Sequence, residues 1–136
     1  MRFYGKAYKD GKFWLAEVPI LDAMTQGLTQ KEAFVMVEDL VETLANRPGF
    51  SVKVHPGVHG HFEVGSSDTR TMVSLLLRRQ RERSGLSLAE AAERLGAKSS
   101  IAYARYEVGT SIPTVEKLDE LLHAISPGQD FVLHLS

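Results

Sequence analysis

The sequence of 136 residues contains no cysteine, which removes several kinds of site at once. Disulfide bonds, thiolate nucleophiles and cysteine-ligated zinc centres all require this residue. No apolar run reaches the ~18 residues that a membrane-spanning helix needs. The longest relevant stretch, Met72 to Leu77, is followed by two arginines. The first residues also lack the apolar segment of a secretory signal, so we expect a cytoplasmic protein.

An excess of charge of either sign is also missing. The chain has 16 lysines and arginines against 17 aspartates and glutamates, for a formal net charge of −1. We therefore do not expect a protein that coats nucleic acid through bulk charge. One local excess is present, because four arginines fall within six positions at Arg78, Arg79, Arg81 and Arg83. On a helix such a cluster either contacts DNA phosphates or lies on a solvated face, and we favour the phosphates.

Residues 1–65 are predicted to form an α+β unit, a small antiparallel sheet with one packed helix. Two short runs rich in aromatic residues, Arg2–Tyr8 and Phe13–Val18, flank Asp10-Gly11. An Asp-Gly pair between two such runs is typical of a hairpin with a type I′ turn, which needs positive φ at both central residues. The unit therefore begins with two antiparallel strands.

A helix and two more strands complete this unit. Thr29 and Glu32 have the spacing of a capping box, and apolar residues then recur at intervals of three and four, which predicts an amphipathic helix. Apolar and polar residues alternate from Phe50 to His55, and a looser strand follows at His61–Val64. The small polar segment Gly65–Asp68 indicates a linker between this unit and the rest of the chain.

Beyond this linker we expect an all-α domain over residues 66–126. Ser87 and Glu90 have the spacing of a second capping box, and glycines mark the ends of helices. The expected helices span Thr69–Arg83, Ser87–Leu95, Ser99–Glu107 and a segment that begins at Pro113. The second and third are short and are joined by a tight turn, and the alanines of the second allow the two to cross closely. This spacing fits a helix-turn-helix that reads the major groove, although an ordinary helical bundle has the same periodicity.

Specific residues of this domain resemble the Cro/C1-type repressor family. The matching residues are Arg81, Gly85-Leu86-Ser87-Leu88-Ala89-Glu90, Ala92, Leu95-Gly96, Arg105-Tyr106-Glu107, Gly109 and Pro113-Thr114. The resemblance implies that Ser99–Glu107 is the recognition helix, that Ser99 is its cap and that Glu107 has a structural role. The candidate DNA-binding residues are Ser87, Lys98, Ser99, Ser100, Ile101, Arg105, Arg79 and Arg81. Leu88 departs from the family, which often has glutamine there, and Arg105 is the best reader because a guanidinium fits guanine O6 and N7.

Almost the whole chain is similar to HicB-type antitoxins. In the first half the similarity rests on Tyr4, Lys9-Asp10-Gly11, Phe13-Trp14, Ala16, Val18-Pro19, Thr25-Gln26-Gly27, Thr29 and Glu32-Ala33. In the second half it rests on Ser99, Ala102–Glu107, Gly109 and Pro113–Leu118. The resemblance implies a partial RNase H-like N-terminal domain that binds and masks a HicA-like, RNA-cleaving toxin. It also implies a C-terminal domain that binds double-stranded operator DNA as a homodimer or a tetramer.

Tyr4, Trp14 and Gln26 are the candidate toxin-binding residues. Aromatic residues dominate the energetics of protein interfaces, but Tyr4 and Trp14 could equally belong to the core of a small sheet. Leu21–Met24 departs from the HicB family, which more usually has Pro-Gly-Cys there, so a partner contact through that loop stays open. Two other functions also stay open. One is a one-component regulator whose α+β unit senses a small molecule, and the other is an interaction module that has lost DNA binding.

An RNase H-like fold raises the question of catalysis. Two-metal phosphodiester cleavage needs three or four carboxylates that converge on one point. The carboxylates of residues 1–65 are assigned to a turn, a cap and the polar side of the helix, so we expect no catalytic residues, no cofactor and no enzyme. His55, His59 and His61 lie within seven positions and could bind zinc. A solvated glycine-rich turn without a thiol or carboxylate is the favoured interpretation, so we expect no metal.

The final segment, residues 127–136, is predicted to form a short strand after a Pro-Gly turn. Phe131, Leu133 and Leu135 alternate with Val132 and His134. A lone strand cannot satisfy its backbone groups, and the helical domain offers no strand to pair with. The simplest partner is the same strand of a second subunit, which makes Phe131, Leu133 and Leu135 candidate dimerisation residues. The competing interpretation is that the strand folds back onto its own N-terminal sheet.

Overall fold

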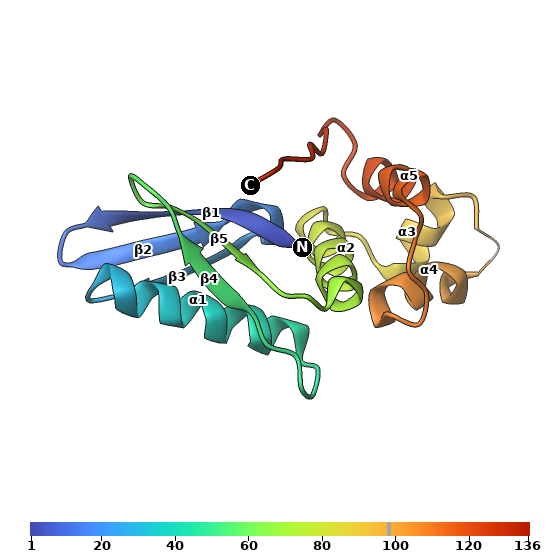
Figure 1. Ribbon diagram of the computed structural model, residues 1–136. Coiled ribbons are helices and arrows are strands. Elements are labelled where there is room, and N and C mark those ends of the chain that lie inside the picture. The colour runs from blue at the N-terminus through green and yellow to red at the C-terminus, as the bar shows by residue number, and fades with distance from the viewer. Residues whose placement is uncertain (98) are drawn as a thin grey trace.

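The chain folds into a sheet with one helix, followed by a group of four helices (Figure 1). The computed structural model describes residues 1–97 and 99–136. The elements are β1 (Arg2–Asp10), β2 (Phe13–Val18), a 3₁₀ turn (Pro19–Leu21), β3 (Ala23–Gly27), α1 (Gln30–Ala45), β4 (Lys53–Pro56), β5 (His61–Gly65), α2 (Thr69–Arg83), α3 (Leu88–Arg94), α4 (Ser100–Val108) and α5 (Val115–Ile125). The predicted α+β class is confirmed. None of the helices in the described part of the chain is long and apolar enough to cross a membrane.

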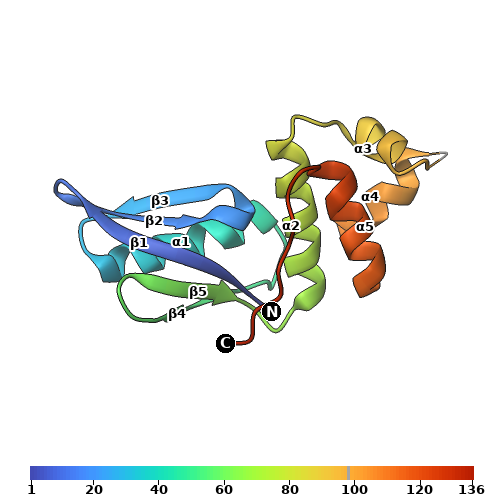
Figure 2. The same cartoon turned by 90° about the horizontal axis from the view of Figure 1, so that it is seen from above.

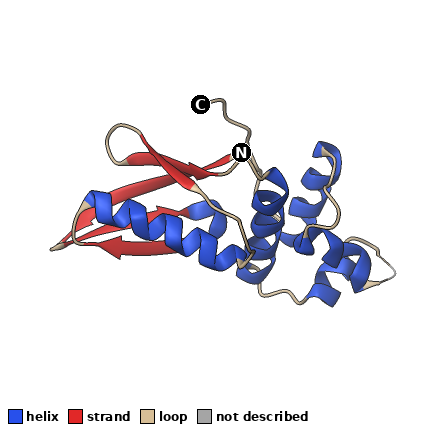
Figure 3. Cartoon of the chain, turned by 60° about the horizontal axis from the view of Figure 1, so that its bottom comes forward, coloured by secondary structure: helices blue, strands red, loops and turns tan. Residues whose placement is uncertain are grey.

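The sheet has five antiparallel strands in the order β3-β2-β1-β5-β4. β3 lies at one margin and β4 at the other, as Figure 2 shows. α1 covers one face, and Figure 3 shows it lying across the strands. Among the described residues, no helix of the same unit covers the opposite face. β3 was not predicted from the sequence, because Ala-Met-Thr-Gln-Gly has neither an apolar alternation nor a run of β-branched residues.

The first hairpin has a different turn from the predicted one. Asp10 is the last residue of β1 and pairs with Phe13, so the two turn residues are Gly11 and Lys12. Of these only Gly11 has a positive φ, at 61°. A glycine at the first central position is what a type II′ turn requires, whereas type I′ needs positive φ at both. The hairpin is confirmed, and the type I′ prediction is wrong.

α1 begins where the sequence predicts. The Thr29 side chain accepts a hydrogen bond from the Glu32 N–H at 3.0 Å, which is one half of the predicted capping box. Ala33, Val37 and Val41 are fully buried against the sheet. Their spacing of four residues places them on one face, so their burial anchors α1 to the sheet.

α2 lies between the sheet unit and the other helices, and it is buried on nearly all sides (Figure 1). The buried residues of α2 are Thr71, Met72, Val73, Ser74, Leu75, Leu76, Leu77 and Gln80. They belong to a single buried cluster that contains both Val37 of α1 and Leu121 of α5. The predicted linker is therefore a short connection into this helix, where Asp68 caps α2 by accepting from the Thr71 N–H at 3.1 Å.

The predicted C-terminal strand is not formed within this single chain. Residues 129–136 have no regular secondary structure, and Val132, Leu133 and Leu135 are 87 to 97% exposed. Phe131 packs partly against the core, and the Ser136 hydroxyl donates to Glu63 Oε1 at 2.7 Å. The tail therefore runs back towards the sheet without joining it (Figure 1). A strand needs a neighbour to satisfy its ladder, and no strand of this chain pairs with the tail among the described residues.

Candidate nucleic-acid interface

One face of α4 is open to solvent and the other is fixed in the core. Ile101 is 63% exposed and Val108 is 63% exposed, and both Ala102 and Arg105 are also exposed. These positions share one face of the helix, since they follow the three- and four-residue spacing. On the opposite face Tyr103 is only 1% exposed, and burial raises the pKa of its hydroxyl. α4 therefore presents a short surface that a groove can receive.

The structure places most of the predicted base readers of α4 together. Ile101 and Arg105 lie on the exposed face, whereas Ser100 is half-buried. Ser99 caps the helix by accepting from the Ile101 N–H at 3.1 Å, as the family position implied. No hydrogen bond or ion pair within the described residues engages the guanidinium of Arg105. Lys98 lies outside the described residues.

Arg81 has an internal partner. Its guanidinium makes a two-bond contact with the Glu107 carboxylate, at 2.7 Å from Nε and 2.9 Å from Nη2. The Arg81 side chain is 14% exposed and that of Glu107 is 6% exposed. Nη1 also donates to the Leu86 carbonyl at 2.8 Å, and the bonds to Glu107 raise the pKa of Arg81. This pair ties α2 to the end of α4, which is the structural role implied for Glu107 and a different one from the phosphate contact expected of Arg81.

Two other arginines of the cluster also contact protein. Arg79 donates to the carbonyls of Leu21 and Asp22, at 2.8 and 2.9 Å. Arg78 donates to the Leu44 carbonyl at the end of α1 and lies 3.3 Å from Glu82. These two guanidiniums hold the α+β unit against α2, so they are not directed at phosphates in this structure. No local pattern indicates these contacts, because the acceptors are main-chain carbonyls far away along the chain.

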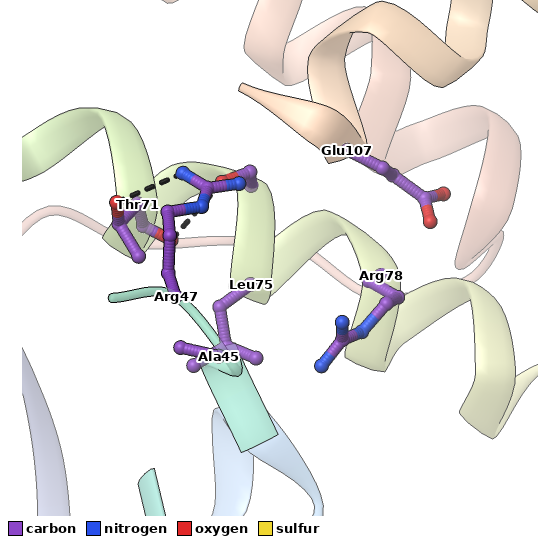
Figure 4. Close-up of a pocket in the computed structure, with 7 residues that line it drawn as sticks. Ala45, Arg47, Thr71, Leu75, Arg78 and Glu107 are labelled. Atoms are coloured by element: carbon purple, nitrogen blue, oxygen red, sulfur yellow. Dashed lines mark hydrogen bonds between the residues drawn. The ribbon is translucent and has the colours of Figure 1, made fainter. Parts of the chain in front are cut away.

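Two further arginines hold the C-terminal end of α4. Arg47, in the loop after α1, donates to the Val108 carbonyl at 2.6 Å. It also donates to the Thr71 hydroxyl at 2.9 Å (Figure 4). Arg70 of α2 donates to the Gly109 carbonyl at 2.8 Å. These bonds satisfy carbonyls that a helix end leaves without partners. Arg47 and Glu107 both line a cavity of about 10 Å³, room for a single water. α4 is thus positioned in part by the α+β unit.

α3 is short and carries the predicted capping box. Ser87 Oγ accepts from the Glu90 N–H, and Glu90 Oε1 accepts from the Ser87 N–H, each at 3.1 Å. These bonds lower the pKa of Glu90. Leu88 follows at the first helical position and is 38% exposed. Leu88 stands where the Cro/C1-type family often has a glutamine that can form hydrogen bonds. The hydroxyl of Ser87 is therefore the main side-chain group that the N-terminal end of α3 could present to DNA.

The candidate toxin-binding residues do not lie on one surface. Successive residues of a strand point to opposite faces. Tyr4 and Gln26 fall on the face away from α1, where Tyr4 is 50% exposed and its hydroxyl lies 2.7 Å from His61 Nδ1. Trp14 pairs with Gly27 on the face that α1 covers, and it packs against the core. Trp14 therefore packs against the core and not on an open surface, which was one of its two expected places. Tyr4 and Gln26 lie on the surface.

The described residues contain no group of three or more histidine, aspartate or glutamate side chains placed to hold a metal ion. His61 contacts Tyr4, as above, and His59 is in the turn before β5 with a φ of 55°. Two carboxylates of α1 have structural uses: Glu38 accepts from the Val54 N–H at 2.8 Å, and Glu42 accepts from the Val52 N–H at 3.2 Å.

The comparison with known families agrees with this geometry. Residues 77–125 match the model of a helix-turn-helix family. The matched segment contains α3, α4 and α5 entirely, together with the C-terminal part of α2. A comparison with curated proteins gives no match. The C-terminal part of the chain is therefore a helix-turn-helix domain, the architecture of a DNA-binding regulator.

Proposed function

We propose that the chain is a DNA-binding repressor whose α+β unit binds and masks a small RNA-cleaving toxin, in the manner of HicB-type antitoxins. The exposed face of α4 carries the DNA-binding half of this proposal. Ile101 and Arg105 project from it, while the rest of the helix is fixed by Tyr103 and Glu107. A rigid helix with a free guanidinium can read guanine in the major groove through O6 and N7.

A single helix of this length reads only a few base pairs, so we expect the chain to act as a homodimer or a tetramer. A dimeric helix-turn-helix protein binds two half-sites about 34 Å apart. An inverted repeat upstream of the chain's own gene is the simplest operator. This arrangement would let the protein repress the operon that encodes it and its partner.

DNA binding is tested with the full chain and fragments from upstream of its gene, over a series of salt concentrations. We expect one fragment to bind specifically, with affinity falling steeply as salt rises because phosphate contacts release counterions. Arg105→Ala should weaken specific binding by about 5- to 150-fold, since a two-bond guanine contact contributes about 1–3 kcal/mol. Arg2→Ala, which breaks an exposed ion pair with Glu63 on the sheet, is the matched control. If no fragment binds at low salt, the repressor function is wrong and the chain is an interaction module.

The antitoxin half rests on the resemblance of residues 1–65 and on the surface that this unit leaves open. The sheet face away from α1 exposes Tyr4, and the margin at β3 exposes Met24, which is 53% accessible. Co-expression of the chain with the protein of the adjacent reading frame tests this half. We expect a stable complex in which the ribonuclease activity of the small protein is lost.

The small-molecule alternative requires a ligand cavity in the α+β unit. A cleft of about 340 Å³ lies on the helical side and is lined by Arg83, Ser84, Arg94, Ser126, Pro127 and Gln129. A ligand bound there would contact the helical domain and not the α+β unit.

A further inference from the structure

The two margins of the sheet differ in how their outward backbone groups are satisfied. At β4 the outward N–H of Val54 donates to Glu38 of α1. The Val52 N–H, just before the strand, donates to Glu42 in the same way. The other outward residue of β4 is Pro56, which has no N–H. The β4 margin is therefore closed to a further strand by α1 and by proline, as protected edge strands usually are.

The β3 margin has no such protection. Asp10 and Phe13, the pair next to the two-residue turn, exchange backbone hydrogen bonds. Along β2, successive residues then direct their N–H and C=O groups alternately towards β1 and towards β3. The residues of β2 that bond to β3 are consequently Trp14, Ala16 and Val18, whose partners are Gly27, Thr25 and Ala23. The N–H and C=O groups of Met24 and Gln26 then point away from the sheet. Within the described residues, no further strand or side chain pairs with them.

Exposed apolar side chains and a carboxylate lie beside this free margin. Met24 and Leu28, in β3 and just after it, are 53 and 61% exposed. The start of α1 lies directly beside β3, since a Cβ built on Gly27 would come within 2.5 Å of the Ala33 nitrogen. α1 carries four carboxylates against one lysine; Glu38 and Glu42 bond to the β4 side, whereas the exposed Glu32 lies next to the end of β3. A free row of amides with apolar and acidic side chains beside it suits a strand from a basic protein.

We propose that the β3 margin is a docking edge at which a small basic protein adds a strand to the sheet. This inference rests on the proposed function, in which that protein is the toxin. A second copy of the chain suits the edge less well. Antiparallel pairing of two β3 strands would bring two α1 helices together on the same face, and both are negatively charged. The partner's main chain would bond to the outward groups of Met24 and Gln26, and Leu28 would pack beside it.

The test compares two substitutions at one position in the full chain. Gln26→Pro removes an outward N–H without removing a bond to β2, whereas Gln26→Ala removes only the side chain. The probe is the protein of the adjacent reading frame, with affinity measured by titration calorimetry. We expect Gln26→Pro to weaken binding by at least about tenfold and Gln26→Ala by less than about threefold. Circular dichroism and a thermal melt establish that both variants fold.

A measurement on the unsubstituted chain covers the case in which Gln26→Pro does not fold. Complex formation should slow hydrogen exchange at the amides of Met24 and Gln26. Unchanged exchange there, or equal affinities for the two variants, would overturn the proposal. So would strong loss of binding with Tyr4→Ala alone, which would place the partner on the open face. A chain that self-associates in solution, and becomes monomeric with Gln26→Pro, would show that the occupant is a second copy.

Absence of any binding by the unsubstituted chain would have a different meaning. It would refute the antitoxin half of the proposed function and this inference with it, while operator binding could still stand. Binding that is retained by every β3 variant would refute only the docking edge. The two failures are therefore distinguishable.

Discussion

Breaking the ion pair between Arg81 and Glu107 is expected to be the most damaging change to the helix-turn-helix domain. Glu107→Ala leaves the guanidinium of Arg81 with only the Leu86 carbonyl as a partner, in a site where the arginine side chain is 14% exposed. Removing one member of a buried pair costs about 3–5 kcal/mol, because the remaining charge is left without compensation. We expect about 3 kcal/mol here, since the Leu86 carbonyl remains. This is a large share of a total stability of about 5–15 kcal/mol.

Urea denaturation followed by circular dichroism measures the effect. Glu120→Ala is the matched control, because it breaks an ion pair with Lys117 whose side chains are 36 and 55% exposed. Exposed pairs contribute about 0–1 kcal/mol, so the control should change little. Replacing both partners, Arg81→Met with Glu107→Leu, should recover much of the lost stability, because apolar groups need no compensation. If Glu107→Ala lowers the free energy of unfolding by less than about 1 kcal/mol, the pair behaves as an exposed ion pair and the reasoning from its burial is wrong.

Three further predictions follow from contacts described above. Arg47→Ala should weaken operator binding without loss of fold, because the Val108 carbonyl at the end of α4 loses its hydrogen-bond donor. If fluorescence anisotropy gives the same operator affinity for the variant and the unsubstituted chain, this prediction is wrong. Hydrogen bonds from Thr71 lower the pKa of Asp68, so this carboxylate stabilises the fold above its unfolded pKa and the contribution is lost as pH falls through the folded pKa. Asp68→Asn should therefore flatten the acid side of the stability profile, measured by thermal melts from neutral to acid pH. Deletion of residues 129–136 should lower the oligomeric mass measured by sedimentation and reduce operator affinity, while toxin binding is kept. An unchanged dimer with full operator affinity would exclude the tail as the dimerisation element.

Features encoded in a few adjacent residues were predictable from the sequence. The caps at Thr29, Ser87 and Ser99 all lie where the pattern placed them, because a capping hydroxyl and its amide are two or three residues apart. Ile101 and Arg105 were identified as candidate DNA-binding residues from the Cro/C1-type resemblance. The structure places both on the exposed side of α4.

Contacts between distant segments were not predictable in this way. A cluster of arginines carries the same sequence pattern whether it faces phosphates or carbonyls, so nothing in the local sequence of Arg79 shows that Leu21 is its acceptor. Arg47 is an isolated cation in a loop, and only the fold brings it to Val108. β3 was missed for a related reason, since its pairing with β2 depends on the chain reversing at the 3₁₀ turn rather than on its own composition.

The burial of α2 on both of its sides limits how this protein can be taken apart or rebuilt. A cut at Gly65 would leave a helical fragment with much of the apolar surface of α2 open to water, and a sheet fragment without the helix that covers its 3₁₀ turn. A chimaera that borrows this DNA-reading part would need to carry the whole of α2 and the Arg47 loop with it. Insertions and deletions in homologous chains should accordingly be tolerated in the turn after β4 and in the tail, and rare in the three residues that lead into α2.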